Sequence, residues 1–183
     1  MASKHGNATD LPNLLSASRA VAGLALLGTP VGALRAPLIS WGALSDFLDG
    51  FAARRLGIVS AFGAGFDLFC DGVFFIGALA AFWRDGVISM TWLITIVVAG
   101  GGLQLLVQCI LVFRRRPIGS TGHPLSKVLG AAAYLFVIGL AAGVPVRCLA
   151  PALVALQLTA NGRDLVAVIQ LANASVPSDL ASN

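Results

Sequence analysis

Residues Ser45–Phe75 read SDFLDGFAARRLGIVSAFGAGFDLFCDGVFF, and this stretch holds four of the eight acidic residues of the chain. Asp46 and Asp49 are three residues apart, and Asp67 and Asp71 are four apart. Because residues three and four apart lie on the same face of a helix, each pair is predicted to share one helical face. The short connection between the pairs makes the two helices antiparallel neighbours. The four carboxylates are therefore expected to converge at one end of a helix pair.

The composition of the whole chain places this stretch in a membrane protein. Hydrophobic residues make up 57% of the 183 residues and charged residues only 11%, against about 25% in a typical soluble domain. Mean hydropathy is +0.89. This composition excludes soluble single-core domains, disordered chains, collagen-like chains and disulfide scaffolds. We therefore expect an all-α fold, a polytopic membrane helical bundle, in a single domain over residues 1–183.

Six apolar segments approach the length of about 20 residues that a membrane-spanning helix needs. The six predicted transmembrane helices cover residues 13–34, 36–53, 61–83, 89–113, 125–143 and 144–161. Pro30 predicts a kink near the far end of the first span. The apolar pattern resumes at residues 165–172 after a polar break, and this segment is either an interfacial helix or the end of a long sixth helix.

Basic residues fall mainly on one side of these six spans, which predicts the orientation of the chain. Nine of the twelve lysines and arginines share the side that carries both termini. Because positive residues favour the cytoplasmic side, both termini are predicted to face the cytoplasm from an inner, or cytoplasmic, membrane. The net charge of +4 then indicates contact with anionic membrane lipid and not with nucleic acid. Small residues at 100–102 and 131–133 favour close packing within the bundle or a homodimer.

Four carboxylates grouped at a membrane boundary require compensating positive charge. Each ionised aspartate within a membrane helix costs about 2.5–3.5 kcal/mol on the gentlest insertion scale. Oxygen ligands without a nearby histidine favour the hard divalent cations Mg²⁺, Mn²⁺ or Ca²⁺ over Zn²⁺. Since Mg²⁺ commonly bridges carboxylates and phosphates, a diphosphate substrate fits this cluster better than a purely structural ion does.

Small and basic residues next to the aspartates suit a nucleoside diphosphate. Gly50 and Ala53 lie on the carboxylate side of the second predicted helix and leave room for a ligand against the backbone. Arg54 follows them, where its guanidinium can donate two hydrogen bonds to phosphate oxygens. Gly63 likewise removes a side chain near the start of the third helix. Arg19, on the first span, either faces inward or caps the cytoplasmic end of its helix.

The spacing D-x2-D-G-x2-A-R-x8-G-x3-D-x3-D resembles the signature of the CDP-alcohol phosphatidyltransferases. The chain matches every fixed position of that signature: Asp46, Asp49, Gly50, Ala53, Arg54, Gly63, Asp67 and Asp71. The segment PNLLSASR at residues 12–19 is similar to the start of the first helix in the same family. The resemblance covers the whole chain and implies six membrane helices with cytoplasmic termini.

The resemblance also implies a reaction. A hydroxyl group of an alcohol acceptor attacks the β-phosphate of CDP-diacylglycerol, and CMP leaves. Asp46, Asp49 and Asp67 would bind one or two Mg²⁺ or Mn²⁺ ions. Asp71 would act as the general base while also reaching a metal. The CDP-lipid site would be formed by Gly50, Ala53, Arg54 and Gly63.

The choice of acceptor depends on weaker signals. Lys127, at the start of the fifth span, is placed to bind a phosphorylated acceptor, whereas the arginines at 114–116 either bind the acceptor or anchor the loop to anionic lipid. A phosphorylated acceptor favours glycerol 3-phosphate, as in phosphatidylglycerophosphate synthase-like members, and then inositol phosphate. Serine and other alcohols are alternatives.

Two other classes of function compete with this interpretation. The aspartates could form a polar helix contact without chemistry, or they could serve an ion or proton transporter. Transporters place such residues near the middle of the membrane and tend to have internal repeats. The predicted cluster lies near one face, and the sequence has no visible repeat.

Overall fold

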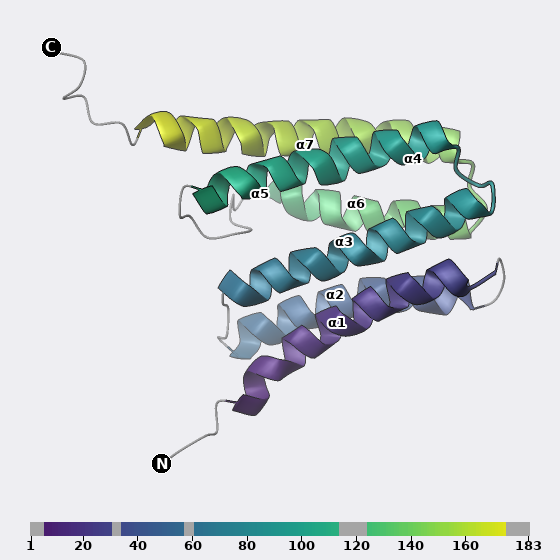
Figure 1. Cartoon of the computed structure of the whole chain (residues 1–183), viewed down its shortest axis with the longest axis horizontal. Helices are drawn as coiled ribbons and strands as arrows, with labels where there is room; N and C mark the ends of the chain where they lie inside the picture. The colour runs from purple at the N-terminus through teal and green to yellow at the C-terminus, as the bar shows by residue number, and fades with distance from the viewer. Residues whose placement is uncertain (1–5, 31–33, 57–60, 114–123, 175–183) are drawn as a thin grey trace, which may run out of the picture.

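The computed structural model describes residues 6–30, 34–56, 61–113 and 124–174, and this part of the chain is helical with short turns (Figure 1). This confirms the all-α prediction. The first three helices are α1 (Gly6–Gly28), α2 (Arg35–Leu56) and α3 (Ala61–Arg84). The fourth long segment consists of α4 (Met90–Ile96), the π-helical turn η1 (Val97–Gly102) and α5 (Leu103–Phe113). The last two helices are α6 (Pro124–Ala141) and α7 (Val146–Ala174).

The helices form two groups that lie side by side in Figure 1. α1 packs against both α2 and α3, and this is the most extensive contact in the described chain. α7 packs against α6, η1 and α5 in the second group. The two groups meet where α6 contacts α2 and α3, and the buried ring of Phe74 lies beside Tyr134 at that junction. This arrangement leaves the α1–α2–α3 group to build the site around the aspartates.

Glycines allow α1 and α3 to approach closely. A Cβ atom on Gly77 would lie 2.2 Å from the carbonyl oxygen of Gly23, and one on Gly23 would lie 2.4 Å from the Cα atom of Phe74. Real Cβ atoms do not come this near to backbone atoms, so only glycine allows this spacing. The two helix backbones are therefore in direct contact. This contact places the α1 residues one and two turns before Gly23 next to the aspartates of α3.

The π-helical turn η1 lies within the predicted fourth span and contains its three glycines. A π-turn leaves backbone carbonyl groups without their usual helical partners. The buried side chain of Asn161 on α7 donates hydrogen bonds from Nδ2 to the carbonyl oxygens of Ala99 and Gly100, at 3.1 and 3.2 Å. The polar break at residues 161–164 of the sequence thus serves a helix contact.

Several predicted boundaries differ from the structure. α1 ends at Gly28, so the prediction of a kink at Pro30 is wrong: the proline follows the helix instead of bending it. α7 is one continuous helix to Ala174, so residues 165–172 are the end of a long last helix and not a separate interfacial one. Asp164 faces the bundle with only 4% of its surface exposed.

The predicted count of six membrane spans is not confirmed. Four described helical segments are long and apolar enough to cross a membrane: Leu11–Gly28, Phe62–Arg84, Met90–Leu111 and Val146–Gln170. The apolar part of α6, Val128–Ala141, is shorter. α2 is long enough at 22 residues, but its two aspartates and three arginines make it less apolar than the others. The chain is an integral membrane protein with at least these four candidate spans.

The end of the bundle remote from the aspartates is held by a second polar network. Arg35, at the start of α2, is buried and pairs with Asp85 in the turn between α3 and α4. Its guanidinium also donates to the carbonyl oxygen of Thr29 at 2.9 Å and lies 5.3 Å from the ring centre of Phe82. Arg84 donates to the same carbonyl at 2.9 Å. This network joins the α1–α2 and α3–α4 connections.

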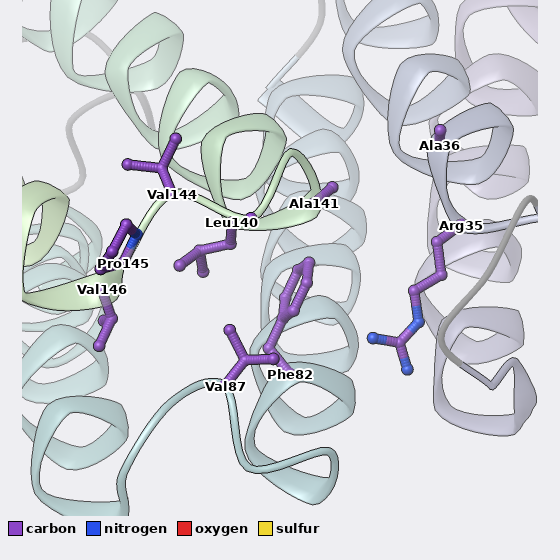
Figure 2. Close-up of a pocket in the computed structure, with 10 residues that line it drawn as sticks. Arg35, Ala36, Phe82, Val87, Leu140, Ala141, Val144, Pro145 and Val146 are labelled. Carbon is purple, nitrogen blue, oxygen red and sulfur yellow. The ribbon is translucent and has the colours of Figure 1, made fainter.

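A pocket of about 340 Å³ adjoins this network. Figure 2 shows Arg35 on one side of the pocket and Val144 and Pro145, from the turn between α6 and α7, on the other, with Phe82 between them. The guanidinium in the pocket is already paired with Asp85. The pocket therefore adjoins a structural ion pair. It lies toward the opposite end of α2 and α3 from the aspartates.

Candidate metal centre

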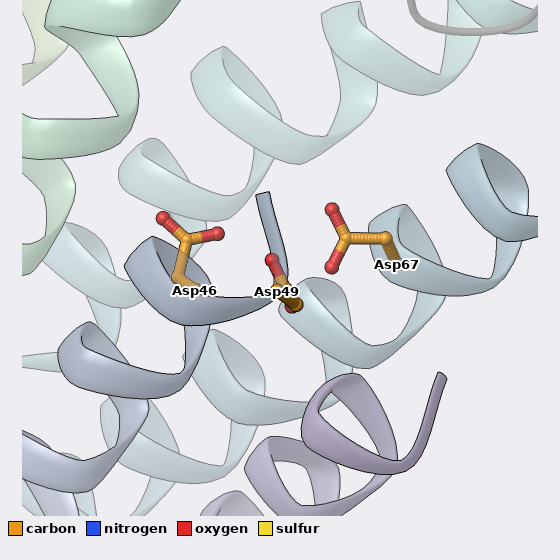
Figure 3. A group of neighbouring side chains, drawn as sticks. All are labelled: Asp46, Asp49 and Asp67. Atoms are coloured by element: carbon orange, nitrogen blue, oxygen red, sulfur yellow. The ribbon is translucent and has the colours of Figure 1, made fainter. Parts of the chain in front are cut away.

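The aspartates predicted to converge do so in the structure. Asp46 and Asp49 lie in the second half of α2, and Asp67 and Asp71 lie in the first half of α3. One carboxylate oxygen from each of Asp46, Asp49 and Asp67 lies within 4.8 Å of the other two (Figure 3). An octahedral Mg²⁺ ion holds its oxygens about 2.1 Å away, which separates opposite ligands by about 4.2 Å. These three carboxylates could therefore hold one ion after a small contraction.

The four aspartates of the cluster differ in how much of each side chain is exposed. Asp49 is buried, with 5% of its surface exposed. The side chains of Asp46 and Asp67 are 41% and 38% exposed, and that of Asp71 is 29% exposed. A ligand arriving at this end of the helices can reach three of the four carboxylates directly. Asp49 is the most deeply buried of the four aspartates.

Asp71 joins the cluster through a basic residue. Arg19 on α1 is completely buried, and its Nη1 atom contacts both Asp71 and Asp46, the latter at 2.7 Å. Its Nη2 atom contacts Asp49 and lies 2.6 Å from Asp67. One guanidinium thus touches all four carboxylates. The structure decides between the two alternatives for Arg19, because the side chain faces inward and does not cap its helix.

A serine on the same face of α1 also contacts the cluster. The Ser16 hydroxyl lies 3.0 Å from Asp49 Oδ2, 3.1 Å from Asp67 Oδ1 and 3.1 Å from the carbonyl oxygen of Pro12. With a single proton it can donate to only one of these acceptors at a time. Sequence reasoning missed this residue. Its spacing from Pro12, Arg19 and Gly23 was the available signal, because residues 12, 16, 19 and 23 follow one face of a helix.

The structure describes only some of the residues that are predicted to bind the nucleotide. Gly50 follows Asp49 on α2, and Gly63 lies in the first turn of α3, so both are at the aspartate end of the helices. Ala53 and Arg54 belong to the last turns of α2, but their side chains lie outside the described residues. The same holds for Lys127 in the first turn of α6. Arg114, Arg115 and Arg116 lie entirely outside the described part of the chain.

The described pockets lie away from this cluster. One is at the Arg35 end, and the other, of about 510 Å³, is an open groove along α7. Neither is lined by an aspartate of α2 or α3 among the residues that the structure describes. The aspartate site is a partly exposed cluster among α1, α2 and α3.

The comparison with protein families agrees with this site. A family model described as CDP-alcohol phosphatidyltransferase matches residues 9–160, a range that includes Ser16, Arg19 and all four aspartates. No curated protein and no solved structure gave a significant match to the chain. The family model covers most of the chain, and the aspartates of its signature converge in the structure between the second half of α2 and the first half of α3. The chain therefore belongs to the CDP-alcohol phosphatidyltransferase family, whose reaction transfers a substituted phosphate group from a CDP-linked alcohol to an alcohol acceptor.

Proposed function

We propose that this protein transfers the phosphatidyl group of CDP-diacylglycerol to glycerol 3-phosphate and releases CMP. The observation that carries the proposal is the group of carboxylates from Asp46, Asp49 and Asp67, whose oxygens lie within 4.8 Å of one another. They come from two helices and have the spacing of the family signature. The group lies between α2 and α3, in a part of the bundle that a lipid-linked diphosphate would reach from the membrane.

The donor set of the cluster fits a hard divalent cation. The ligand atoms are carboxylate oxygens, and Arg19 supplies only one positive charge against four aspartates. We assign Asp46, Asp49 and Asp67, with Asp71 at the edge, to binding one or two Mg²⁺ or Mn²⁺ ions. When bound, such an ion neutralises diphosphate charge and stabilises the leaving phosphate of CMP.

Asp71 is the proposed general base. It is outside the group of three carboxylates that could share one ion, and its side chain is 29% exposed. Its carboxylate takes the proton from the acceptor hydroxyl as the oxygen attacks the β-phosphorus of CDP-diacylglycerol. A bond forms between the acceptor oxygen and phosphorus. The bond between phosphorus and the oxygen of CMP breaks.

The nucleotide and acceptor sites are assigned from sequence position. Gly50 and Gly63 lie at the cluster end of their helices, where the absence of a side chain leaves room for the cytidine diphosphate group. Ala53 and Arg54 complete the proposed CDP-lipid site. Lys127 is assigned to the phosphate of the acceptor. This choice favours glycerol 3-phosphate or inositol phosphate over serine and other neutral alcohols, because a phosphate near four carboxylates needs its own cation.

The proposed setting is an inner, or cytoplasmic, membrane with both chain termini and the aspartate cluster on the cytoplasmic side. The whole chain would act as a single enzymatic domain. We also propose a homodimer, for which the small residues at 100–102 and 131–133 would allow close helix packing. Leu14, Val21 and Leu24 on α1 and Phe62 and Phe69 on α3 are all exposed. In a membrane these side chains contact lipid or a second copy of the chain.

The test is an assay of CMP release by the purified full-length protein. CDP-diacylglycerol is incubated with glycerol 3-phosphate, inositol phosphate or serine in separate reactions with Mg²⁺. We expect release with glycerol 3-phosphate and a labelled phosphatidylglycerophosphate product. Release driven by another acceptor alone would overturn the choice of acceptor while keeping the reaction class. A protein that releases no CMP but moves ions across vesicles would support the transporter alternative.

A further inference from the structure

The contacts of Arg19 are arranged in pairs across two helices. Neutralisation of charge alone would not require this arrangement. Nη1 joins Asp46 of α2 to Asp71 of α3, and Nη2 joins Asp49 of α2 to Asp67 of α3. Each amino group therefore links one carboxylate from each helix. The guanidinium performs the structural task that bridging cations perform between two acidic helices.

The guanidinium and a metal ion need the same oxygen atoms. Asp46, Asp49 and Asp67 are the carboxylates that could share one ion, and each of them is in contact with Arg19. An ion bound to these oxygens at about 2.1 Å would lie within a few ångströms of a guanidinium nitrogen. Two cations so close repel each other, and the burial of Arg19 and Asp49 reduces the screening of that repulsion by water.

In the described part of the chain, the Nε atom of Arg19 adds no hydrogen bond to the contacts made by the two terminal nitrogens of the guanidinium. Its Nε atom is buried and has no hydrogen-bond partner among the described residues. The ion pairs of the side chain are made by Nη1 and Nη2. A cation that takes over the carboxylates therefore removes those contacts without breaking an additional bond at Nε.

We propose that Arg19 is an internal cation that competes with divalent metal ions for the four aspartates, so that metal binding displaces its guanidinium. This inference rests on the metal site of the proposed function and adds the residue that controls metal affinity there. The fixed positive charge holds α2 and α3 together at low metal concentration. The competition weakens metal binding, so that the site fills only when the divalent ion is abundant.

The test measures Mn²⁺ binding to the purified full-length protein in detergent, using the electron paramagnetic resonance signal of free Mn²⁺. We expect Arg19→Gln to bind Mn²⁺ about tenfold more tightly than the wild type, within the range of measured couplings between two binding events. Arg19→Lys should fall between them, because lysine keeps the charge but cannot bridge both carboxylate pairs. The matched control is Arg35→Gln, a second buried arginine at the other end of the bundle, which should leave Mn²⁺ affinity unchanged.

A measurement on the wild-type protein covers the case in which Arg19→Gln does not fold. Protein labelled with ¹⁵N-arginine should show the Arg19 side-chain signal, assigned by its loss in Arg19→Lys, shift on addition of Mg²⁺. A signal that stays unchanged at saturating Mg²⁺ would overturn the competition.

The outcomes separate this inference from the proposed function. Mn²⁺ binding by the wild type with equal or weaker affinity in folded Arg19→Gln would refute the role of Arg19 and leave the metal site in place. No Mn²⁺ binding by the wild type or by any variant would refute the metal site itself.

Discussion

The buried guanidinium of Arg19 offsets part of the negative charge of the aspartate cluster. Arg19 is the most deeply buried charged side chain in the described structure, and Asp49 beside it is 5% exposed. Either charge alone within a membrane helix would cost about 2.5–3.5 kcal/mol on the insertion scale. In contact, each offsets part of the cost of the other. One guanidinium still leaves three carboxylates uncompensated, and this deficit is the physical reason to expect a divalent cation.

Asp71→Asn should lower the turnover number by about 10²-fold or more, because the amide keeps the size of the side chain but cannot accept the proton of the acceptor. CMP release at saturating substrates measures this change. CDP-diacylglycerol binding should survive better than in Asp49→Asn, which removes a proposed metal ligand. Turnover equal to that of the wild type would place the general base elsewhere.

Removal of divalent metal should abolish CMP release. A chelator strips the ion from the carboxylates of Asp46, Asp49 and Asp67, and the diphosphate substrate then meets uncompensated negative charge. Addition of Mg²⁺ or Mn²⁺ in excess over the chelator should restore the activity. Full activity after exhaustive chelation would contradict the metal assignment.

At the scale of the helices, the spacing of α1 from α3 controls the site. Ser16 and Arg19 reach the carboxylates because Gly23 on α1 meets Gly77 on α3 backbone to backbone. These glycines lie about one to three helical turns from the aspartates of α3 and from the site residues of α1. A side chain between the backbones would separate the helices along their whole contact and draw Arg19 away from α2 and α3.

Gly77→Ala should therefore lower the free energy of unfolding by about 1–3 kcal/mol, the usual cost of overpacking. Its new Cβ atom would lie 2.2 Å from the carbonyl oxygen of Gly23, a backbone atom that cannot turn aside. Thermal unfolding in detergent measures the loss, and CMP release should fall with it. Gly130→Ala on α6 is the control, because its Cβ would meet no atom within 4 Å. Equal loss in both variants would refute the role of the close contact.

At the scale of the whole molecule, the two ends of the α1–α2–α3 group carry different polar networks. The aspartate cluster is at one end and is open to ligands. At the other end Asp85 pairs with buried Arg35 and accepts a hydrogen bond from Arg84 Nε at 3.0 Å. The contact with Arg35 ties the α3–α4 turn to α2, whereas Arg84 is the last residue of α3. The network around Arg35 and Asp85 therefore stabilises the connections between helices. The aspartate cluster is the network that is available for chemistry.

The ion pair between Asp85 and Arg35 should make the stability of the fold depend on pH in the acid range. Burial raises the pKa of the Asp85 carboxyl, but hydrogen bonds from Arg84 and Arg35 and their charges outweigh burial and lower this pKa below its ordinary value. A lowered pKa in the folded state means that the stabilisation is present above the pKa of the unfolded chain, about 3.9. It is lost as the pH falls through the lower folded value.

The measurement compares thermal unfolding of wild type and Asp85→Asn as the pH falls from 6 to about 2. At pH 6 the variant should melt lower, because Arg35 has lost its ionised partner. The difference between the two proteins should shrink below a pH of about 4. A difference that stays constant with pH would show that the Asp85 charge does not stabilise the fold.

The orientation of the molecule can be checked by labelling single cysteines with a reagent that does not cross membranes. Cys70, Cys109 and Cys148 are first replaced by alanine, since all three are free thiols. A cysteine at Gly119 should react only from the cytoplasmic side, and one at Val87 only from the opposite side. Reaction of both from one side would contradict the proposed topology and the entry side of CDP-diacylglycerol.

The sequence alone determined the helical membrane fold and the convergence of the aspartates. Both depend on local periodicity: apolar runs of sufficient length predict helices in a membrane, and spacings of three and four place Asp46 with Asp49 and Asp67 with Asp71. The spacing of the signature also indicated the family. A short connection was enough to predict that the two pairs meet.

Only the tertiary structure decided what meets the aspartates. Arg19 contacts Asp71 across 52 positions of sequence, and Ser16 contacts Asp67 across 51. No local pattern reports such contacts, because they depend on how closely two helix backbones approach and on their rotation about their axes. The close packing of Gly23 on Gly77 sets that approach. The same holds for α7, which continues past Asn161 because that side chain finds its partners on the π-turn of another helix.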